Sequence, residues 1–234
     1  MNNVHKIRQR EIKKNTEILK DYWTKSQKLY INVLKPVLDF FFALLGIIFL
    51  LPLFLIISIV IKLDSKGPIF FRQERVGKNS KIFTLIKFRS MTVSSGEKCD
   101  PLKDMERMTW VGNILRKTSL DELPQFFNII KGKMSFIGPR PLLVDYLSNY
   151  TPEQMRRHDV AQGITGLAQV NGRNSINWEE KFKLDVWYGK NISFILDLKI
   201  LIKTIKNILL KIGINNSAEG TMPLFTGNNK VNDY

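Results

Sequence analysis

Two adjacent carboxylates, Asp121 and Glu122, are the residues whose type and position best suit chemistry in this sequence. They follow Arg116 and Lys117, and Pro124 comes shortly after them. A helix that began at Asp121 would hold Pro124 in its first turn, where the missing amide costs nothing. Both acids would then lie at the positive end of the helix dipole. Such surroundings keep a carboxylate ionised, as a nucleophile or a Mg²⁺ ligand requires.

A second interpretation of this stretch assigns the acids no chemistry. Ser119 and Glu122 have the spacing of a capping box, in which both side chains only begin a helix. That register places Pro124 at the fifth helical position, where its missing amide costs a helix hydrogen bond. The residues by themselves leave both interpretations open.

Other kinds of catalytic centre are disfavoured by composition. The chain has two histidines, His5 and His158, and a single cysteine, Cys99. Zinc sites of the Cys/His kind and Ser-His or Cys-His catalysis are therefore nearly excluded, and no intrachain disulfide can form. Any chemistry must rely on carboxylates and basic residues.

Several cations could receive phosphate groups. Lys87 and Arg89 fall on the same face of a strand predicted over residues 81–89, because strand side chains alternate. Arg140 lies between two prolines and after Gly138, which fixes the backbone and presents one planar guanidinium. The structural alternatives are an exposed polar strand face and a rigid turn with an exposed arginine.

A glycine-spaced segment, residues 163–174, could bring backbone amides and Arg173 to a nucleotide phosphate. It lacks the Gly-Lys-Ser/Thr of a Walker loop and the spacing of the dinucleotide-binding glycines. As a pattern on its own it is weak evidence.

These candidates follow an uncharged apolar run, residues 40–61, which is long enough to fill a bilayer. Pro52 predicts a kink near residues 49–51. Basic residues, which stay on the cytoplasmic side, flank both ends of the run, with nine Lys/Arg in residues 1–35 alone. The simplest geometry is a bent helix that enters and leaves through one leaflet, and the alternative is a tilted or kinked full span.

Two charges at the start of this run are candidate membrane-helix residues. Asp39 is costly at the mouth of an apolar helix unless it is paired, and Lys35 is the local candidate partner. Alternatively, Asp39 is an ordinary residue of the first helical turn. The run is too long and begins too late for a signal peptide, so we expect it to be retained.

The net charge of +15 over 234 residues suits an anionic partner, whether lipid headgroups, nucleic acid or a phosphorylated substrate. The membrane run makes lipid the first choice.

The rest of the sequence predicts further elements. Before residue 35 it predicts an interfacial helix or a disordered basic arm. After the apolar run it predicts a strand at 69–71, helical segments at 105–117, 142–150 and 152–159, an amphipathic interfacial helix at 191–212 and a loose tail from 213.

Four ordered blocks resemble the bacterial sugar transferases, the monotopic polyprenyl-phosphate phosphoglycosyl transferases. The resemblance covers about residues 35–212 and is closest to the members that begin bacterial N-linked glycosylation with a diacetylated amino sugar. The blocks are KFRSM at 87–91, RKTSLDELPQ at 116–125, MSFIGPRPLL at 134–143 and GITGLAQVNGRN at 163–174. The chain departs from the family pattern at Lys35-Pro36, Leu51 and Leu167.

The resemblance implies an α+β, mostly helical fold with a re-entrant, Pro-kinked membrane helix, interfacial amphipathic helices and a small α/β cytosolic catalytic domain. The expected boundaries are an N-terminal extension over 1–34, the membrane helix over 35–62, the catalytic domain over 63–212 and a tail over 213–234. It also implies the cytoplasmic face of the bacterial inner membrane.

The chemistry that the resemblance implies is transfer of a sugar 1-phosphate from a UDP-sugar to undecaprenyl phosphate, with release of UMP. Asp121 would attack the sugar-proximal phosphorus, Mg²⁺ would be held by Asp121 and Glu122, and Glu122 would support metal or proton handling. The family's pattern places the substrate-binding cations at Arg116, Arg140 and Arg173, with Lys87 and Arg89 as further candidates. The expected partners are these two substrates and membrane lipid, not nucleic acid.

Two rival hypotheses follow from the same residues. A membrane-anchored basic adaptor would bind anionic lipid or nucleic acid without chemistry. A one-step transferase would use Asp121 and Glu122 only to hold metal, with both substrates bound together.

Overall fold

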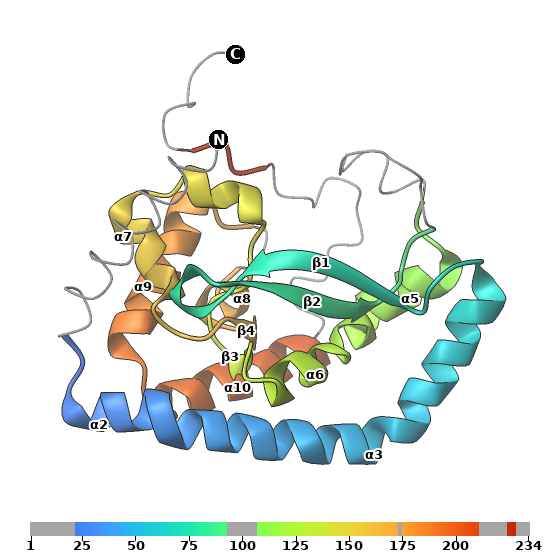
Figure 1. Ribbon diagram of the computed structural model, residues 1–234, viewed down its shortest axis with the longest axis horizontal. Coiled ribbons are helices and arrows are strands. Elements are labelled where there is room, and N and C mark those ends of the chain that lie inside the picture. The colour runs from blue at the N-terminus through green and yellow to red at the C-terminus, as the bar shows by residue number, and fades with distance from the viewer. Residues whose placement is uncertain (1–21, 93–106, 173–174, 211–223, 228–234) are drawn as a thin grey trace.

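The computed structural model describes residues 22–92, 107–172, 175–210 and 224–227 (Figure 1). Within these ranges the chain is mostly helical, with two small two-stranded sheets. The predicted α+β class is confirmed. Arg173 and the other residues outside these ranges receive no structural description.

One long helix forms a side of the molecule. It consists of α2 (Lys25–Leu29), a π-helical turn (Tyr30–Leu34) and α3 (Lys35–Asp64). Thr24 and Gln27 form a reciprocal capping box at its start. Figure 1 shows α3 running beneath the β1–β2 hairpin and then turning toward it. By length and composition this is the one helix in the described ranges that could cross a membrane.

The long helix contacts three hydrophobic clusters in succession. Near its start, Tyr30 and Ile31 belong to one cluster; Ala43 belongs to a second; Phe54, Ile57 and Ile61 belong to a third. Their partners in the rest of the described structure come from both sheets and most helices, and include Ile137, Tyr188, Ile200, Leu85, Ile129, Phe88 and Leu115. Both ends of the membrane-type helix therefore pack against the same body of the protein.

Both sheets are small. Strands β1 (Phe70–Val76) and β2 (Ile82–Phe88) pair antiparallel, with Phe70 opposite Phe88. The two predicted strands are thus confirmed, although β1 continues five residues beyond Phe71. Strands β3 (Ser135–Ile137) and β4 (Gly163–Thr165) pair parallel.

Six further helices complete the described structure. They are α5 (Trp110–Thr118), α6 (Gln125–Ile130), α7 (Pro152–Met155), α8 (Leu167–Val170), α9 (Trp178–Asn191) and α10 (Phe194–Leu209). The sequence pattern did not predict α9, because its buried face includes the charged residue Asp185. The segment predicted as one helix over 142–150 forms a 3₁₀ turn at Val144–Ser148 instead.

Parts of both predicted extensions are packed. Trp23 is buried and donates from Nε1 to the carbonyl oxygen of Gly189, 2.8 Å away. Phe225 is 5% exposed and packs among Tyr146, Tyr150 and the other rings of an aromatic cluster. The prediction of a loose tail is therefore wrong for residues 224–227, because aromatic burial holds this segment.

A close backbone approach at Gly112 yields a stability prediction. A Cβ atom there would lie 1.9 Å from the carbonyl oxygen of Ser90. Since backbone cannot move aside cheaply, Gly112→Ala should lower the free energy of unfolding by about 1–3 kcal/mol, measured by denaturant titration of the full chain in detergent. The control is Gly189→Ala, whose Cβ would find no atom closer than 3.8 Å. It should be neutral or stabilising by up to about 1 kcal/mol; equal losses in both variants would contradict the packing explanation.

Candidate functional site

The candidate site is formed where three segments meet: the end of β2, the turn between α5 and α6, and the turn after β3. Helix α5 ends at Thr118, and the next residue, Ser119, has a left-handed backbone with φ 58°. A 3₁₀ turn, Leu120–Glu122, follows and carries both acids, and α6 begins only after Pro124. The prediction of a helix that starts at Asp121 is therefore wrong. The capping-box alternative is not formed either, because Ser119 makes no side-chain cap hydrogen bond.

Glu122 is the centre of the charge cluster. Its Oε1 atom accepts hydrogen bonds from Lys87 Nζ at 2.7 Å and from Arg140 Nη2 at 2.9 Å. Lys87 Nζ also lies 3.8 Å from Asp121 Oδ2. The structure therefore brings together four of the predicted site residues, two acids and two cations, from three separate sequence blocks.

The two acids have different environments. Burial disfavours ionisation of Glu122, but Arg140 and Lys87 offset it and lower the pKa of Glu122 to about 2. For Asp121 the balance is reversed: burial raises the pKa of its carboxyl, Lys87 opposes the rise and the charge of Glu122 adds to it. The expectation that the surroundings hold both acids ionised is thus met for Glu122. For Asp121 the pKa is shifted in the opposite direction, because burial outweighs the cations.

Arg116 acts on Asp121 only at a distance. Its charge lowers the pKa of Asp121 against the effect of burial. Its own guanidinium donates from Nε to Ser90 Oγ at 3.0 Å and from Nη2 to Met91 Sδ at 3.6 Å. Arg116 therefore lies beside the cluster without contacting either acid.

Arg89 is not part of the cluster. Its buried guanidinium donates to the carbonyl oxygens of Ser65 and Lys66, at 2.7 and 2.8 Å, and to Ser65 Oγ. These acceptors lie just after the end of α3, where helix carbonyl groups lack internal partners. Arg89 thus caps the membrane-type helix, while Lys87, two residues earlier and within β2, reaches the acids.

A buried ion pair that sequence reasoning missed supports Arg140. Arg157, which is 0% exposed, donates to Asp185 Oδ2 at 2.7 Å and to the carbonyl oxygen of Arg140 at 2.8 Å. The Arg140 side chain itself is 46% exposed. The turn is therefore held from behind while the guanidinium stays accessible. Arg157 lies in the segment 152–159, for which the sequence predicted a helix but no ion pair.

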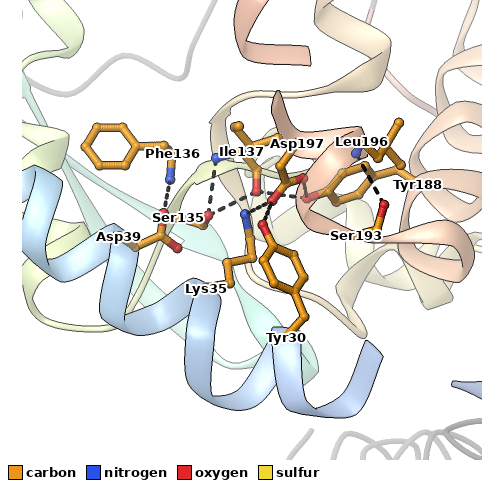
Figure 2. A network of polar contacts seen from close by, with 10 residues as sticks. All are labelled: Tyr30, Lys35, Asp39, Ser135, Phe136, Ile137, Tyr188, Ser193, Leu196 and Asp197. Atoms are coloured by element: carbon orange, nitrogen blue, oxygen red, sulfur yellow. Dashed lines mark hydrogen bonds and ion pairs between the residues drawn. The ribbon is translucent and has the colours of Figure 1, made fainter. Parts of the chain in front are cut away.

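The predicted pairing of Lys35 with Asp39 is replaced by a tertiary one (Figure 2). Lys35 Nζ pairs with Asp197 Oδ2 of α10, and the same carboxylate accepts hydrogen bonds from the hydroxyl groups of Tyr30 and Tyr188, each at 2.7 Å. Asp39 Oδ1 instead accepts from the backbone amide of Phe136 at 3.1 Å. Each charge of the membrane-helix entrance therefore has a partner far away in the sequence.

The carboxylates of the cluster fit Mg²⁺ better than metals that need a complete protein cage. No group of three or more His, Cys, Asp or Glu side chains gathers in the described ranges. Mg²⁺ commonly uses only one or two carboxylates, with substrate phosphates and water as its other ligands. The longer Lys87–Asp121 pair leaves Asp121 less engaged than Glu122, so Asp121 and Glu122 together can supply that donor set.

Comparison with known proteins shows which family this sequence matches. A family model described as bacterial sugar transferase matches residues 30–211. An uncharacterized sugar transferase, EpsL, of Bacillus subtilis is 52% identical over 172 residues, which are 74% of this chain and 85% of that protein.

Two relatives carry more specific names. A UDP-N-acetylgalactosamine-undecaprenyl-phosphate N-acetylgalactosaminephosphotransferase of Aeromonas hydrophila is 42% identical over 77% of this chain and 44% of its own length. A UDP-glucose:undecaprenyl-phosphate glucose-1-phosphate transferase of Klebsiella pneumoniae is 42% identical over 74% of this chain and 39% of its own length. The chain thus spans less than half the length of these two relatives.

The buried histidine behind Arg140 should make stability depend on pH. His158 is fully enclosed, its Nδ1 is 3.2 Å from the carbonyl oxygen of Met155, and burial lowers its pKa well below the ordinary 6.5, with the charge of Arg157 lowering it further. Below pH 6.5 the unfolded chain therefore binds a proton at His158 that the folded chain does not bind. Stability should be full above pH 6.5 and fall by about 1.4 kcal/mol per pH unit below it, measured by denaturant titration between pH 7.5 and 5.5.

Substituting this histidine tests the assignment. In His158→Gln the slope between pH 6.5 and 5.5 should disappear. His5→Gln, which changes the other histidine of the chain, should keep it. A slope that survives in His158→Gln would show that another group is responsible.

Proposed function

This chain belongs to the bacterial sugar transferase family, and we propose that it is a phosphoglycosyl transferase, which moves a sugar 1-phosphate from a UDP-sugar to undecaprenyl phosphate and releases UMP. The observation that carries the proposal is the cluster of Asp121 and Glu122 with Lys87 and Arg140, inside the region that the family model matches. The relatives named for both substrates support it. This would be the first membrane step of a bacterial glycoconjugate.

The sugar is proposed from motif likeness. The four sequence blocks are closest to members that begin N-linked glycosylation, so we propose an N-acetylated amino sugar. The names of the relatives specify different sugars, including glucose and N-acetylgalactosamine. The cluster around Glu122 is suited to the phosphates that all such substrates share.

In the first half of the proposed reaction, a carboxylate oxygen of Asp121 attacks the sugar-proximal phosphorus. A new O–P bond forms, the P–O bond to UMP breaks, and its electron pair leaves with UMP. The ionised Asp121 must approach an anionic diphosphate, so Lys87 and the exposed Arg140 guanidinium would offset the repulsion. The raised pKa of Asp121 makes the carboxylate more basic than an exposed aspartate once it is ionised.

In the second half, a phosphate oxygen of undecaprenyl phosphate attacks the same phosphorus. The acyl phosphate bond breaks and returns the carboxylate of Asp121. Glu122 would keep Lys87 and Arg140 aimed at the reacting phosphates through both halves. Mg²⁺, when bound by Asp121, Glu122 and substrate phosphates, would neutralise charge that develops on the leaving oxygen.

The membrane geometry proposed for this reaction is re-entrant, on the cytoplasmic face of the inner membrane. Its support is that both ends of the long helix pack against the same body, at Ile31 of the π-helical turn in one cluster and at Ile57 and Ile61 of α3 in another. The central part of α3 exposes large apolar residues, including Phe41, Ile48, Phe49, Leu51, Leu55 and Ile56. A helix that enters one leaflet and returns would bury them in lipid and leave the acids near headgroup phosphates.

Replacing the proposed nucleophile tests the covalent mechanism. Asp121→Asn should reduce UMP release from UDP-sugars by roughly a thousandfold or more, since the amide cannot form the covalent intermediate. With UDP-sugar labelled in its sugar-proximal phosphate and no undecaprenyl phosphate, the wild type should retain label on Asp121, found by peptide mass spectrometry. The matched control is Asp145→Asn, at an exposed aspartate, which should keep normal rate and labelling.

Kinetics separate the covalent route from the one-step rival. Parallel double-reciprocal lines are expected when both substrates are varied. Intersecting lines, together with label retained by Asp121→Asn, would rule out the covalent assignment. The absence of UMP release with any UDP-sugar would favour the adaptor instead.

The re-entrant geometry is tested by labelling the two ends of the long helix. Ser26 and Lys66 are exposed on either side of the apolar part. In a Cys99→Ser background, Ser26→Cys and Lys66→Cys should both resist an impermeant maleimide in intact spheroplasts and both react after lysis. Labelling of only one of them before lysis would contradict the proposal. Pro52→Ala should increase the fraction with one end exposed, because a straight helix of this length fills the bilayer.

A further inference from the structure

A second place in the molecule has the make-up of a ligand site. A cleft of about 730 Å³ is lined by α10, by the end of α8 and by Asn171, Gly172 and Ser175. Its walls include Gln169, Asn171 and three lysines, Lys199, Lys203 and Lys206. None of its lining residues belongs to the cluster around Glu122. The cleft is therefore a separate feature of the described structure.

The charge of the cleft is entirely positive. None of the residues that line it is acidic. Lys203 donates to Asn171 Oδ1, whereas Lys199 and Lys206 form no ion pair with the residues that the structure describes. Three ammonium groups that face one concavity without a carboxylate repel one another, so an anion would stabilise them.

A polar side chain in the wall also lacks partners. Both amide atoms of Gln169 are buried, and neither is hydrogen-bonded to any residue in the described ranges. An unsatisfied buried amide costs about 1–3 kcal/mol. A ligand with both an acceptor and a hydroxyl donor, such as a phosphodiester that carries a glycerol, could satisfy the two atoms once the side chain turns toward the cleft.

The position of the lysines on α10 indicates where such a ligand comes from. At about 100° per residue, Lys199, Lys203 and Lys206 share one flank of the helix. Next to this flank lies an exposed apolar face, which includes Leu198, Leu201, Ile202, Ile205, Ile208 and Leu209. Acyl chains would cover that face at a membrane surface, and lysines on its flank would then lie at the height of lipid headgroups. In Figure 1, α10 lies below the β1–β2 hairpin, as the apolar part of α3 does.

We propose that this cleft binds the headgroup phosphate of an anionic glycerophospholipid of the phosphatidylglycerol class, and that the bound lipid holds α10 at the membrane surface. The cations favour a net negative headgroup over a zwitterionic one. A soluble nucleotide is the less favoured occupant, because the lysines adjoin the lipid-facing side of α10. The inference concerns binding alone and does not depend on the transfer reaction.

Native mass spectrometry of the full chain in detergent tests this site with phosphatidylglycerol and phosphatidylcholine as probes. The wild type should retain phosphatidylglycerol in preference to phosphatidylcholine. Lys199→Gln/Lys206→Gln should weaken phosphatidylglycerol binding roughly tenfold or more, and Lys199→Arg/Lys206→Arg should restore it. The control Lys131→Gln/Lys133→Gln removes the same charge from exposed lysines outside the cleft and should bind as the wild type does.

Each other outcome overturns the proposal. Unchanged binding by the Lys199/Lys206 variant would show that the cleft is not the site, and equal losses in the control variant would show diffuse attraction to basic surface. Displacement of the lipid by millimolar inorganic phosphate would assign the cleft to free phosphate, and displacement by UMP would assign it to the nucleotide. Thermal unfolding of each variant checks that it is folded. Gln169→Glu places a negative charge in the same wall of the cleft and should independently weaken phosphatidylglycerol binding.

Discussion

The buried ion pair between Lys35 and Asp197 is the constraint on which the rest of the structure depends. It joins the start of the long apolar helix to α10, and both side chains are almost completely buried. Charges of this kind are stable in an interior only when they are paired and hydrogen-bonded. Tyr30 and Tyr188 supply the hydroxyl groups that complete the pairing (Figure 2). Two helices with exposed apolar faces are thereby held to one body.

The other end of the long helix is connected to the candidate site through a single strand. Arg89, just after β2, binds the carbonyl groups beyond the end of α3, and Lys87, within β2, binds Glu122. The end of the long helix and the acid pair are therefore both linked to residues at the end of β2. For the proposed lipid substrate, which is confined to the membrane, such a connection would keep the carboxylate at a defined height.

Glu122 and Asp121 have opposite pKa shifts within the cluster. Glu122 is held ionised by two cations and orders them, whereas Asp121 is less engaged and its carboxyl has a raised pKa. Adjacent carboxyls with such different environments commonly have different roles in catalysis. This difference is consistent with one acid that reacts and one that positions the two cations. The buried Arg157–Asp185 pair also supports Arg140, because Arg157 donates to its carbonyl oxygen without contacting either acid.

The sequence by itself determined the features that depend on local composition: the apolar run with Pro52, the two strands β1 and β2, and the acid pair among its basic neighbours. The α+β class followed from the family resemblance of the four sequence blocks. The tertiary structure alone decided which charged residues pair with one another and which of them are buried. It paired Lys35 with Asp197 instead of Asp39, turned Arg89 to the end of α3, placed the acids in a 3₁₀ turn and raised the pKa of Asp121. The physical reason is that periodicity and propensity act over a few residues, whereas charge pairing and desolvation depend on segments distant in the chain, which only the completed fold brings together.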